Sequence, residues 1–303
     1  QDAAQNHGCV DLMRGPASHG SRLVAVKRMP TLWVQRGPKE FEAEYPESSE
    51  RPWHDMGIVR KLNAIGFPYA CELKGVFCND ESTFVVTSLA TDGDLHTWCH
   101  RTCRPGQLRE QCIRPIAAQL FAAVRWLHNL GIAHRDLSLE NILLTRGKLG
   151  EPLVRLIDFG MATLSQKAPG EALGKPVCQA PEMHGELPEY DTFLADDFAL
   201  GVVLFAMAAQ DYPWVATEPN SCRLYEYVRT VGFRTFLEQR KLRHGCGENL
   251  IDVFSPELVD VLEGLLEADP KERLTLGESC YTPERRSVWS ELWMEGWDGG
   301  VSP

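Results

Sequence analysis

The sequence lacks a hydrophobic run long enough to cross a lipid bilayer, which needs about 20 consecutive apolar residues. Its longest apolar stretch, from Phe198 to Ala209, is shorter and suits a buried core helix. No signal or transit peptide, internal repeat or low-complexity tract is visible. We therefore expect no membrane partner and a soluble chain, cytoplasmic by default, although the sequence leaves the compartment open.

Positive charge is also scarce. There are 31 lysines and arginines against 42 acidic residues, which gives a net charge of -11. This balance repels phosphate backbones, so we expect no nucleic-acid partner and regard basic peptides as the more natural partners. The ten cysteines are scattered without the spacing of a disulfide framework, which favours reduced thiols.

The patterning that is present divides the chain into two unequal parts. Residues 22–29 and 83–89 read as strands, and Pro52 begins a helical pattern after a polar connector over residues 37–52. Apolar residues then recur every three or four positions across 107–130, which predicts a long helix. A strand-rich part followed by a helical part predicts an α+β protein with a small and a large lobe.

The strongest chemical signal is the stretch GIAHRDLSLENILL at 131–144, followed by LIDFG at 156–160. Asp136 and Asn141 lie five residues apart on a tight loop, so Asp136 can face a substrate hydroxyl while Asn141 and Asp158 turn oxygens to a metal ion. Phosphoryl transfer requires positioned phosphates, a hard cation such as Mg²⁺ and an acceptor for the hydroxyl proton. This stretch predicts that chemistry.

The ordered motifs HRDxxxxN, DFG and APE at 180–182 resemble the protein kinase superfamily, over roughly residues 24–275. The resemblance implies a Ser/Thr protein kinase that uses ATP with Mg²⁺ or Mn²⁺, with Asp136 as catalytic base. It also implies that Asp196 braces the catalytic loop and that Arg273 pairs with Glu182.

The same resemblance implies a nucleotide site in the small lobe. The strand VAVK at 24–27 places Lys27 on the ATP phosphates, and Thr87 matches the gatekeeper position. The other expected nucleotide-binding residues are Gly8, Val10, Ala25, Ser88, Leu89, Ala90, Asp94 and Leu143. The implied organisation is a single kinase domain over 1–303, with a small lobe at 1–88, a hinge at 89–92, a large lobe at 93–288 and a tryptophan-rich tail at 289–303.

Two departures from the family pattern affect the phosphates. Only Gly8 remains of the usual glycine triad, since Ala3 and Gln5 occupy the other two positions. The acidic partner of Lys27 falls on Asp55, one methylene shorter than the usual Glu, with Glu50, Glu47 and Glu44 as alternatives.

On the acceptor side, Ser138 stands where most Ser/Thr kinases carry a lysine. Lys175 and Cys178 replace the usual Thr and Tyr before APE. One hypothesis is that Lys175 supplies part of the missing charge, because an ammonium is a mobile point charge on a long stem.

The missing glycines, the KRMP end of the lysine strand and Trp33 are also similar to the apicomplexan FIKK kinases. That resemblance implies a parasite kinase, secreted or exported to the host cell. Alternatives to an active Ser/Thr enzyme are an ATP-binding pseudokinase scaffold and a tyrosine or dual-specificity kinase. The glutamate at position 140, just before Asn141, is similar to the residue that Ser/Thr kinases carry there. Asp94 and Glu140 occupy places that hold substrate arginines in basophilic kinases.

Some features allow further readings. His96, Cys99, His100 and Cys103 could share one side of a helix and bind zinc. Trp289, Trp293 and Trp297 would form one stripe on a helical tail, which favours packing on the chain's own lobe. Thr163 and Ser165 are candidate phosphorylation sites that could pair with Arg135, but constitutive activity is an equal expectation. We expect a monomer.

Overall fold

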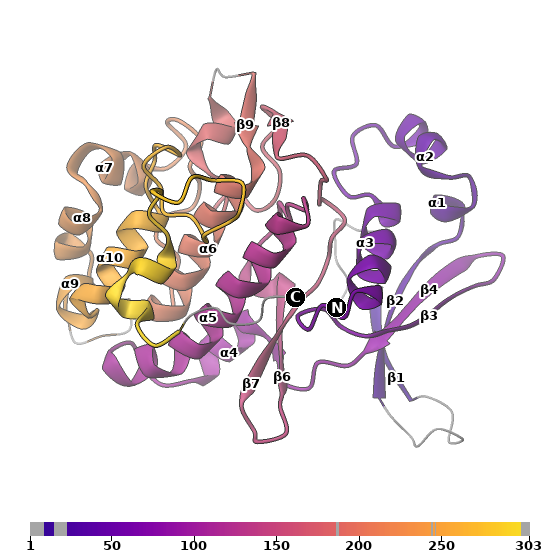
Figure 1. The fold of residues 1–303 in the computed structure, drawn as a ribbon, viewed down its shortest axis with the longest axis horizontal. Helices are drawn as coiled ribbons and strands as arrows, with labels where there is room; N and C mark the ends of the chain where they lie inside the picture. Colours follow the sequence, from indigo (N-terminus) through magenta and orange to yellow (C-terminus); the bar gives the residue numbers. More distant parts are fainter. Residues whose placement is uncertain (1–8, 15–22, 186–187, 244, 246, 298–303) are drawn as a thin grey trace.

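The chain folds into two lobes of unequal size, seen at the right and left of Figure 1. This computed structural model describes residues 9–14, 23–185, 188–243, 245 and 247–297. The predicted nucleotide residue Gly8 lies outside the described residues. The α+β, two-lobed architecture expected from the sequence is confirmed.

The small lobe is built on a four-stranded antiparallel sheet in the order β1-β2-β4-β3. The strands are β1 (Cys9–Arg14), β2 (Leu23–Pro30), β3 (Leu73–Cys78) and β4 (Ser82–Ser88). β2 and β4 match the two strands predicted from the sequence to within one residue. They pair with Lys27 opposite Val85 and Ala25 opposite Thr87, so the register brings the predicted nucleotide residues of both strands side by side.

Helix α3 (Pro52–Ala64) packs on this sheet and begins at Pro52, as predicted. Proline suits the first helical position because its missing N–H has no partner there anyway. Ile58 and Leu62 face the core. These residues lie one helical turn apart, so a single face of α3 is buried.

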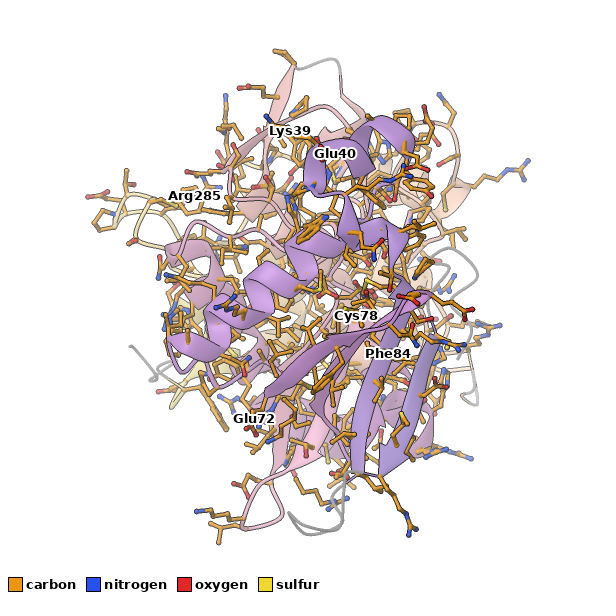
Figure 2. All side chains as sticks on the ribbon, turned by 90° about the vertical axis from the view of Figure 1, so that its right-hand side faces the viewer. Lys39, Glu40, Glu72, Cys78, Phe84 and Arg285 are labelled. Atoms are coloured by element: carbon orange, nitrogen blue, oxygen red, sulfur yellow. The ribbon has the colours of Figure 1, made fainter. Side chains whose placement is uncertain are left out.

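The polar composition of residues 37–52 suggested an irregular connector, but part of this segment is helical. Helix α2 (Pro38–Glu44) forms its first half, and the short helix α1 (Leu32–Gln35) lies just before it. The Phe41 ring lies 5.8 Å from Trp33 and 5.0 Å from Tyr45, and this aromatic cluster gives an otherwise polar segment a core of its own. In Figure 2 Lys39 and Glu40 mark α2 at the upper edge of the small lobe, above the strands that carry Cys78 and Phe84.

The large lobe is mainly helical. Its helices are α4 (Leu95–Arg101), α5 (Gln107–Asn129), α6 (Thr192–Ala209), α7 (Arg223–Val231), α8 (Phe233–Gln239), α9 (Leu250–Val253) and α10 (Pro256–Leu265). Its strands are β5 (Gly93–Asp94), β6 (Ile142–Arg146), β7 (Pro152–Leu156), β8 (Lys167–Pro169) and β9 (Glu189–Asp191). Single 3₁₀ turns cover Leu139–Asn141, Pro181–His184, Val288–Ser290 and Leu292–Met294. The predicted helix at 107–130 is α5.

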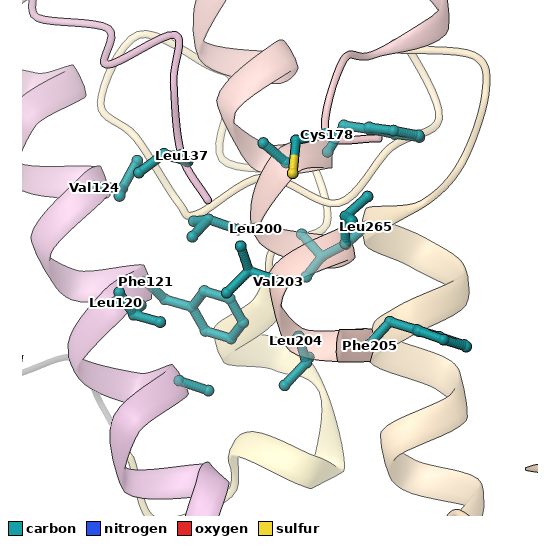
Figure 3. Close-up of a cluster of buried hydrophobic side chains, with 14 of the residues drawn as sticks. Leu120, Phe121, Val124, Leu137, Cys178, Leu200, Val203, Leu204, Phe205 and Leu265 are labelled. Carbon is teal, nitrogen blue, oxygen red and sulfur yellow. The ribbon is translucent and has the colours of Figure 1, made fainter. Parts of the chain in front are cut away.

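Helix α6 is the centre of the large lobe, and all of its 18 residues are buried. Figure 3 shows Leu120 and Phe121 of α5 on one side of α6 and Leu265 of α10 on the other. The helix begins six residues before the apolar run seen in the sequence, because Asp191 caps it by accepting from the N–H groups of Phe193 and Leu194. It is therefore long and apolar enough to span a membrane by composition, but it is a core helix, as expected.

The tryptophan-rich end forms two 3₁₀ turns in place of a continuous helix. The Trp289 indole N–H donates to the Leu276 carbonyl at 2.6 Å, and the Trp293 indole lies 3.4 Å from a Glu110 carboxylate oxygen. Each ring therefore docks at its own site on the lobe, which a regular helix would not allow. The expected packing on the chain's own lobe is found, whereas the single helical stripe is not.

The close contact between α6 and α10 predicts opposite effects for two glycine substitutions. A methyl group at Gly201 would lie 2.9 Å from Leu265 Cβ, whereas one at Gly57 in α3 would meet nothing within 4 Å. We expect Gly201→Ala to destabilise the fold by about 1–3 kcal/mol through overpacking. Gly57→Ala, the control, is expected to stabilise it by about 0.5–1 kcal/mol. Thermal melting of both variants tests this, and equal melting temperatures would contradict it.

Candidate active site

The loop that carries Asp136 is held from below by Asp196 of α6. The two Asp196 carboxylate oxygens accept from the backbone N–H groups of His134 at 2.6 Å and Arg135 at 2.8 Å. Arg135 has a positive φ of 65°, a conformation that side chains rarely adopt. The charge-assisted bonds from Asp196 offset this strain and fix the direction of the next residue, Asp136. The brace implied by the sequence is therefore present in the structure.

Asp136 and Asn141 meet at the mouth of this loop. The Asn141 side-chain N–H₂ donates to the Asp136 backbone carbonyl at 2.8 Å and to its carboxylate Oδ2 at 2.6 Å. Burial is the main reason why the pKa of Asp136 is raised above its ordinary value. A half-buried carboxylate with a raised pKa, held beside a cleft, is suited to accept a proton.

Asn141 and Asp158 supply oxygen ligands of the kind that Mg²⁺ prefers. Asn141 uses its N–H₂ group on Asp136, which leaves its side-chain carbonyl oxygen for a metal ion. The Oδ1 atom of Asp158 lies 3.2 Å from Lys27 Nζ, and among the described residues its Oδ2 has no hydrogen-bond partner. The donor set therefore fits the magnesium site predicted from these two residues.

Lys27 lies between two carboxylates from different lobes. Its Nζ is 2.9 Å from Asp55 Oδ2 and 3.2 Å from Asp158 Oδ1. Desolvation by burial alone would lower its pKa, but the attraction of Asp55 and Asp158 outweighs it, and the pKa of Lys27 is raised. The lysine is therefore a permanent cation at the position expected for ATP phosphates.

Of the acidic alternatives weighed from the sequence, the structure brings Asp55 to Lys27. Its other oxygen, Oδ1, accepts from the Phe159 backbone N–H at 3.1 Å. The Arg51 backbone N–H donates to the Gly160 carbonyl at 2.9 Å, which draws the start of α3 onto the same segment. This close approach explains how the shorter side chain reaches Lys27. Glu44 instead pairs with Arg36 at 3.1 Å.

A cavity of about 260 Å³ lies between the lobes beside Lys27. It is lined by the predicted nucleotide residues Val10, Ala25, Thr87, Ser88, Leu89, Ala90 and Leu143. Mostly apolar walls with a polar edge suit a planar base. Asp94 does not line it and instead caps α4, where its Oδ1 accepts from the Thr97 N–H at 2.6 Å.

Sequence reasoning missed several residues of this cavity: Met56, Val59, Cys71, Val85, Leu156 and Ile157. Met56 and Val59 lie three residues apart on α3, and this spacing, which places them together on the side toward the cavity, was the available signal. Cys71 lies outside the regular elements, and no pattern in the sequence points to it.

The acceptor side of the site is closed by the segment before APE. Gly174 has a φ of 79°, and a Cβ there would lie 2.7 Å from the Arg135 carbonyl, so only glycine allows this approach. The next residue, Lys175, pairs with Glu140 at 2.5 Å. Its positive charge partly offsets the rise that burial causes in the pKa of Asp136. Ser138 is buried beneath, and no described group bonds its hydroxyl.

Arg135, the arginine expected to receive an activation-loop phosphate, donates instead to the Tyr190 hydroxyl at 3.0 Å. The Ser165 hydroxyl donates to the Lys167 carbonyl at 2.6 Å, and the Thr163 hydroxyl accepts from the Ser165 N–H at 3.2 Å. Both candidate phosphorylation sites are thus bonded locally within their own segment.

The zinc hypothesis for His96, Cys99, His100 and Cys103 is not supported. Helix α4 ends at Arg101, so Cys103 lies beyond it. The His96 and His100 rings pack edge to face at 4.7 Å. Among the described residues these four do not form a group that could hold a metal ion.

Below the site, Arg273 and Glu182 form the pair expected from the sequence. Two parallel bonds join them, at 2.6 Å from Nη1 to Oε1 and at 2.8 Å from Nη2 to Oε2. The Arg273 side chain is fully buried and that of Glu182 is 6% exposed. The pair therefore ties the APE segment to the loop after α10.

Removal of one partner from this pair leaves a buried charge, so we expect Glu182→Ala to destabilise the protein by about 3–5 kcal/mol. The control is Glu263→Ala, whose ion pair with Arg234 is 40–46% exposed and which is expected to cost at most about 1 kcal/mol. Denaturant unfolding measures both, and a small effect of Glu182→Ala would show that the buried pair does not stabilise this lobe.

Comparison with known proteins agrees with this geometry. The chain is 26% identical to the serine/threonine-protein kinase RAD53 of Saccharomyces cerevisiae over 76% of its length, 28% identical to SRK2I of Arabidopsis thaliana over 90% and 29% identical to SRK2D of the same plant over 82%. The match covers 27% of RAD53, 66% of SRK2I and 65% of SRK2D. The family model of the protein kinase domain matches residues 12–283, and the chain therefore belongs to the protein kinase domain family.

Proposed function

We propose that this chain is an active serine/threonine kinase that transfers the γ-phosphoryl group of ATP to protein hydroxyls. The observation that carries the proposal is the joint arrangement of Asp136, Asn141, Asp158 and Lys27. Mg²⁺, or Mn²⁺, when held by Asn141 and Asp158, would neutralise phosphate charge. Lys27 would bind the phosphates, and Asp136 would orient the acceptor hydroxyl and take its proton.

The same arrangement favours an enzyme over a pseudokinase scaffold. Lys27, Asp55 and Asp158 are partly buried charges, and buried ion pairs contribute little net stability once desolvation is counted. A scaffold would gain nothing from keeping them together with a half-buried Asp136. An enzyme needs all four, because each serves a different part of phosphoryl transfer.

The choice of Ser or Thr as acceptor rests on Glu140 before Asn141 and on the relatives, which are serine/threonine kinases by name. A preference for basic substrates is supported by the net charge of -11. It is supported less by Glu140, whose charge is engaged by Lys175. A monomeric state and the finer likeness to FIKK kinases, with export to a host cell, stay proposals. Trp33, one of the residues behind that likeness, packs against Phe41 of α2.

We expect Asp136→Asn to lower kcat by about 10²–10⁴-fold, since the amide cannot accept the hydroxyl proton. The assay is transfer of labelled phosphate from Mg²⁺-ATP to serine, threonine and tyrosine versions of one basic peptide. Glu189→Gln, an exposed change on the same lobe, is the control. Nucleotide binding without transfer in the wild-type chain would favour the scaffold, and labelling of only the tyrosine peptide would overturn the acceptor assignment.

The raised pKa of Asp136 predicts a pH dependence. The carboxylate must be deprotonated to act, so kcat should fall as pH drops through a value above the ordinary aspartate pKa of about 3.9. Lys175 lowers the pKa of Asp136, so Lys175→Ala should move this acidic limb to higher pH. Profiles of kcat against pH for both proteins test this. Superimposable limbs would show that Lys175 does not act on Asp136.

A further inference from the structure

A polar cluster is buried behind the catalytic loop, on the far side of Asp196. It consists of His128 from the last turn of α5, Asp196 and Asp197 from α6, and Glu278 from the loop after Arg273. None of the four is more than 4% exposed. His128 joins two of the acids, with Nδ1 2.7 Å from Glu278 Oε1 and Nε2 3.1 Å from Asp196 Oδ2.

Asp197 is the unexplained member of this cluster. It is 0% exposed, and no described group bonds either of its carboxylate oxygens. Asp196, by contrast, uses both oxygens on the catalytic loop, and the second oxygen of Glu278 accepts from the Leu276 N–H at 3.0 Å. An ionised carboxylate buried without a partner costs several kcal/mol, so its charge calls for compensation.

Neighbouring protein cations balance this negative charge only in part. Burial alone would lower the pKa of His128, but its bonds to Asp196 and Glu278 raise that pKa to about 10, so the imidazole carries one positive charge. Arg273 lies close enough to act on Asp197 electrostatically, but its guanidinium is committed to Glu182 and to the Leu194 and Glu267 carbonyls. Three carboxylates therefore lie around one imidazole, which contacts only two of them, in a cluster that is at most 4% exposed. A further positive charge that contacts Asp197 and Glu278 at once would balance the charge of this cluster.

The geometry suits a small divalent cation. Ligand atoms of His128, Asp197 and Glu278 all lie within 4.8 Å of one another. A tetrahedral zinc ion with bonds of about 2.1 Å holds its ligand atoms roughly 3.4 Å apart, so small side-chain rotations would close the site. Metal-bound histidines commonly donate their second ring N–H to a carboxylate, which is the contact that His128 Nε2 makes with Asp196.

We propose that His128, Asp197 and Glu278 form a structural zinc site, with water as the fourth ligand. One imidazole and two carboxylates form a donor set that zinc accepts, whereas Mg²⁺ prefers oxygen ligands alone. Ser279 and Cys280, next to Glu278, are exposed, so the ion would enter through this loop. The zinc would orient His128 and, through it, Asp196, which holds the catalytic loop.

The competing explanation is a proton on Asp197. Burial and the neighbouring Glu278 raise the pKa of Asp197 well above its ordinary value, which would keep the acid neutral. The two explanations differ in their response to Asp197→Asn. An asparagine copies the shape of the neutral acid, so it would preserve stability in the proton case and remove a ligand in the zinc case.

The test is the zinc content of the whole chain, measured by elemental analysis after dialysis, and melting temperature with and without ZnCl₂. We expect about one zinc per chain in the wild type, and a loss of zinc affinity in Asp197→Asn greater than the roughly 10–100-fold typical of outer-shell changes. Zinc should raise the melting temperature of the wild type and not of the variant.

Two control variants separate other sources of the signal. Asp252→Asn makes the same change at an exposed site of the large lobe and should keep the zinc. Asp158→Asn removes a ligand of the predicted magnesium site and should also keep it. Zinc retained by Asp197→Asn would place the ion elsewhere, and a zinc-free wild type with an equally stable Asp197→Asn would overturn the proposal in favour of the proton.

Discussion

The arrangement of the active site depends on one carboxylate, that of Asp196 at the centre of the large lobe. Its two bonds to the His134 and Arg135 N–H groups hold a strained backbone turn in place. The position of Asp136 follows from that turn, and the position of Asn141 follows from its bonds to Asp136. Because α6 is buried along its whole length, the brace is anchored in the close-packed core of the lobe.

A second chain of contacts connects the small lobe to the large lobe beside this loop. Lys27 reaches Asp158 directly, and Asp55 links Lys27 to the backbone of Phe159. The two lobes are thus joined by charge through the same segment that is predicted to hold the metal ion. Loss of Asp55 would affect both the lysine and the position of that segment.

The large lobe was more predictable from the sequence than the small one. Its motifs are contiguous, so the residues around Asp136 and Asp158 could be placed from spacing alone, and the Arg273 pair followed from the family resemblance. The helix α2 was missed because its stability comes from ring contacts between Trp33, Phe41 and Tyr45, which a polar composition conceals. The sequence could not predict that Asp197 is buried without a hydrogen-bond partner and close to Glu278. Glu278 lies 81 positions later, and only the fold brings the two residues together.

The wall of the cavity beside Lys27 has a consequence for inhibitor chemistry. The small side chain of Thr87 and the thiol of Cys71 lie in the same lining. Burial raises the pKa of the Cys71 thiol, so little of it is in the reactive thiolate form near neutral pH. An electrophilic warhead aimed at this cysteine would react slowly, and selective compounds would have to gain their affinity from the shape of the space beside Thr87.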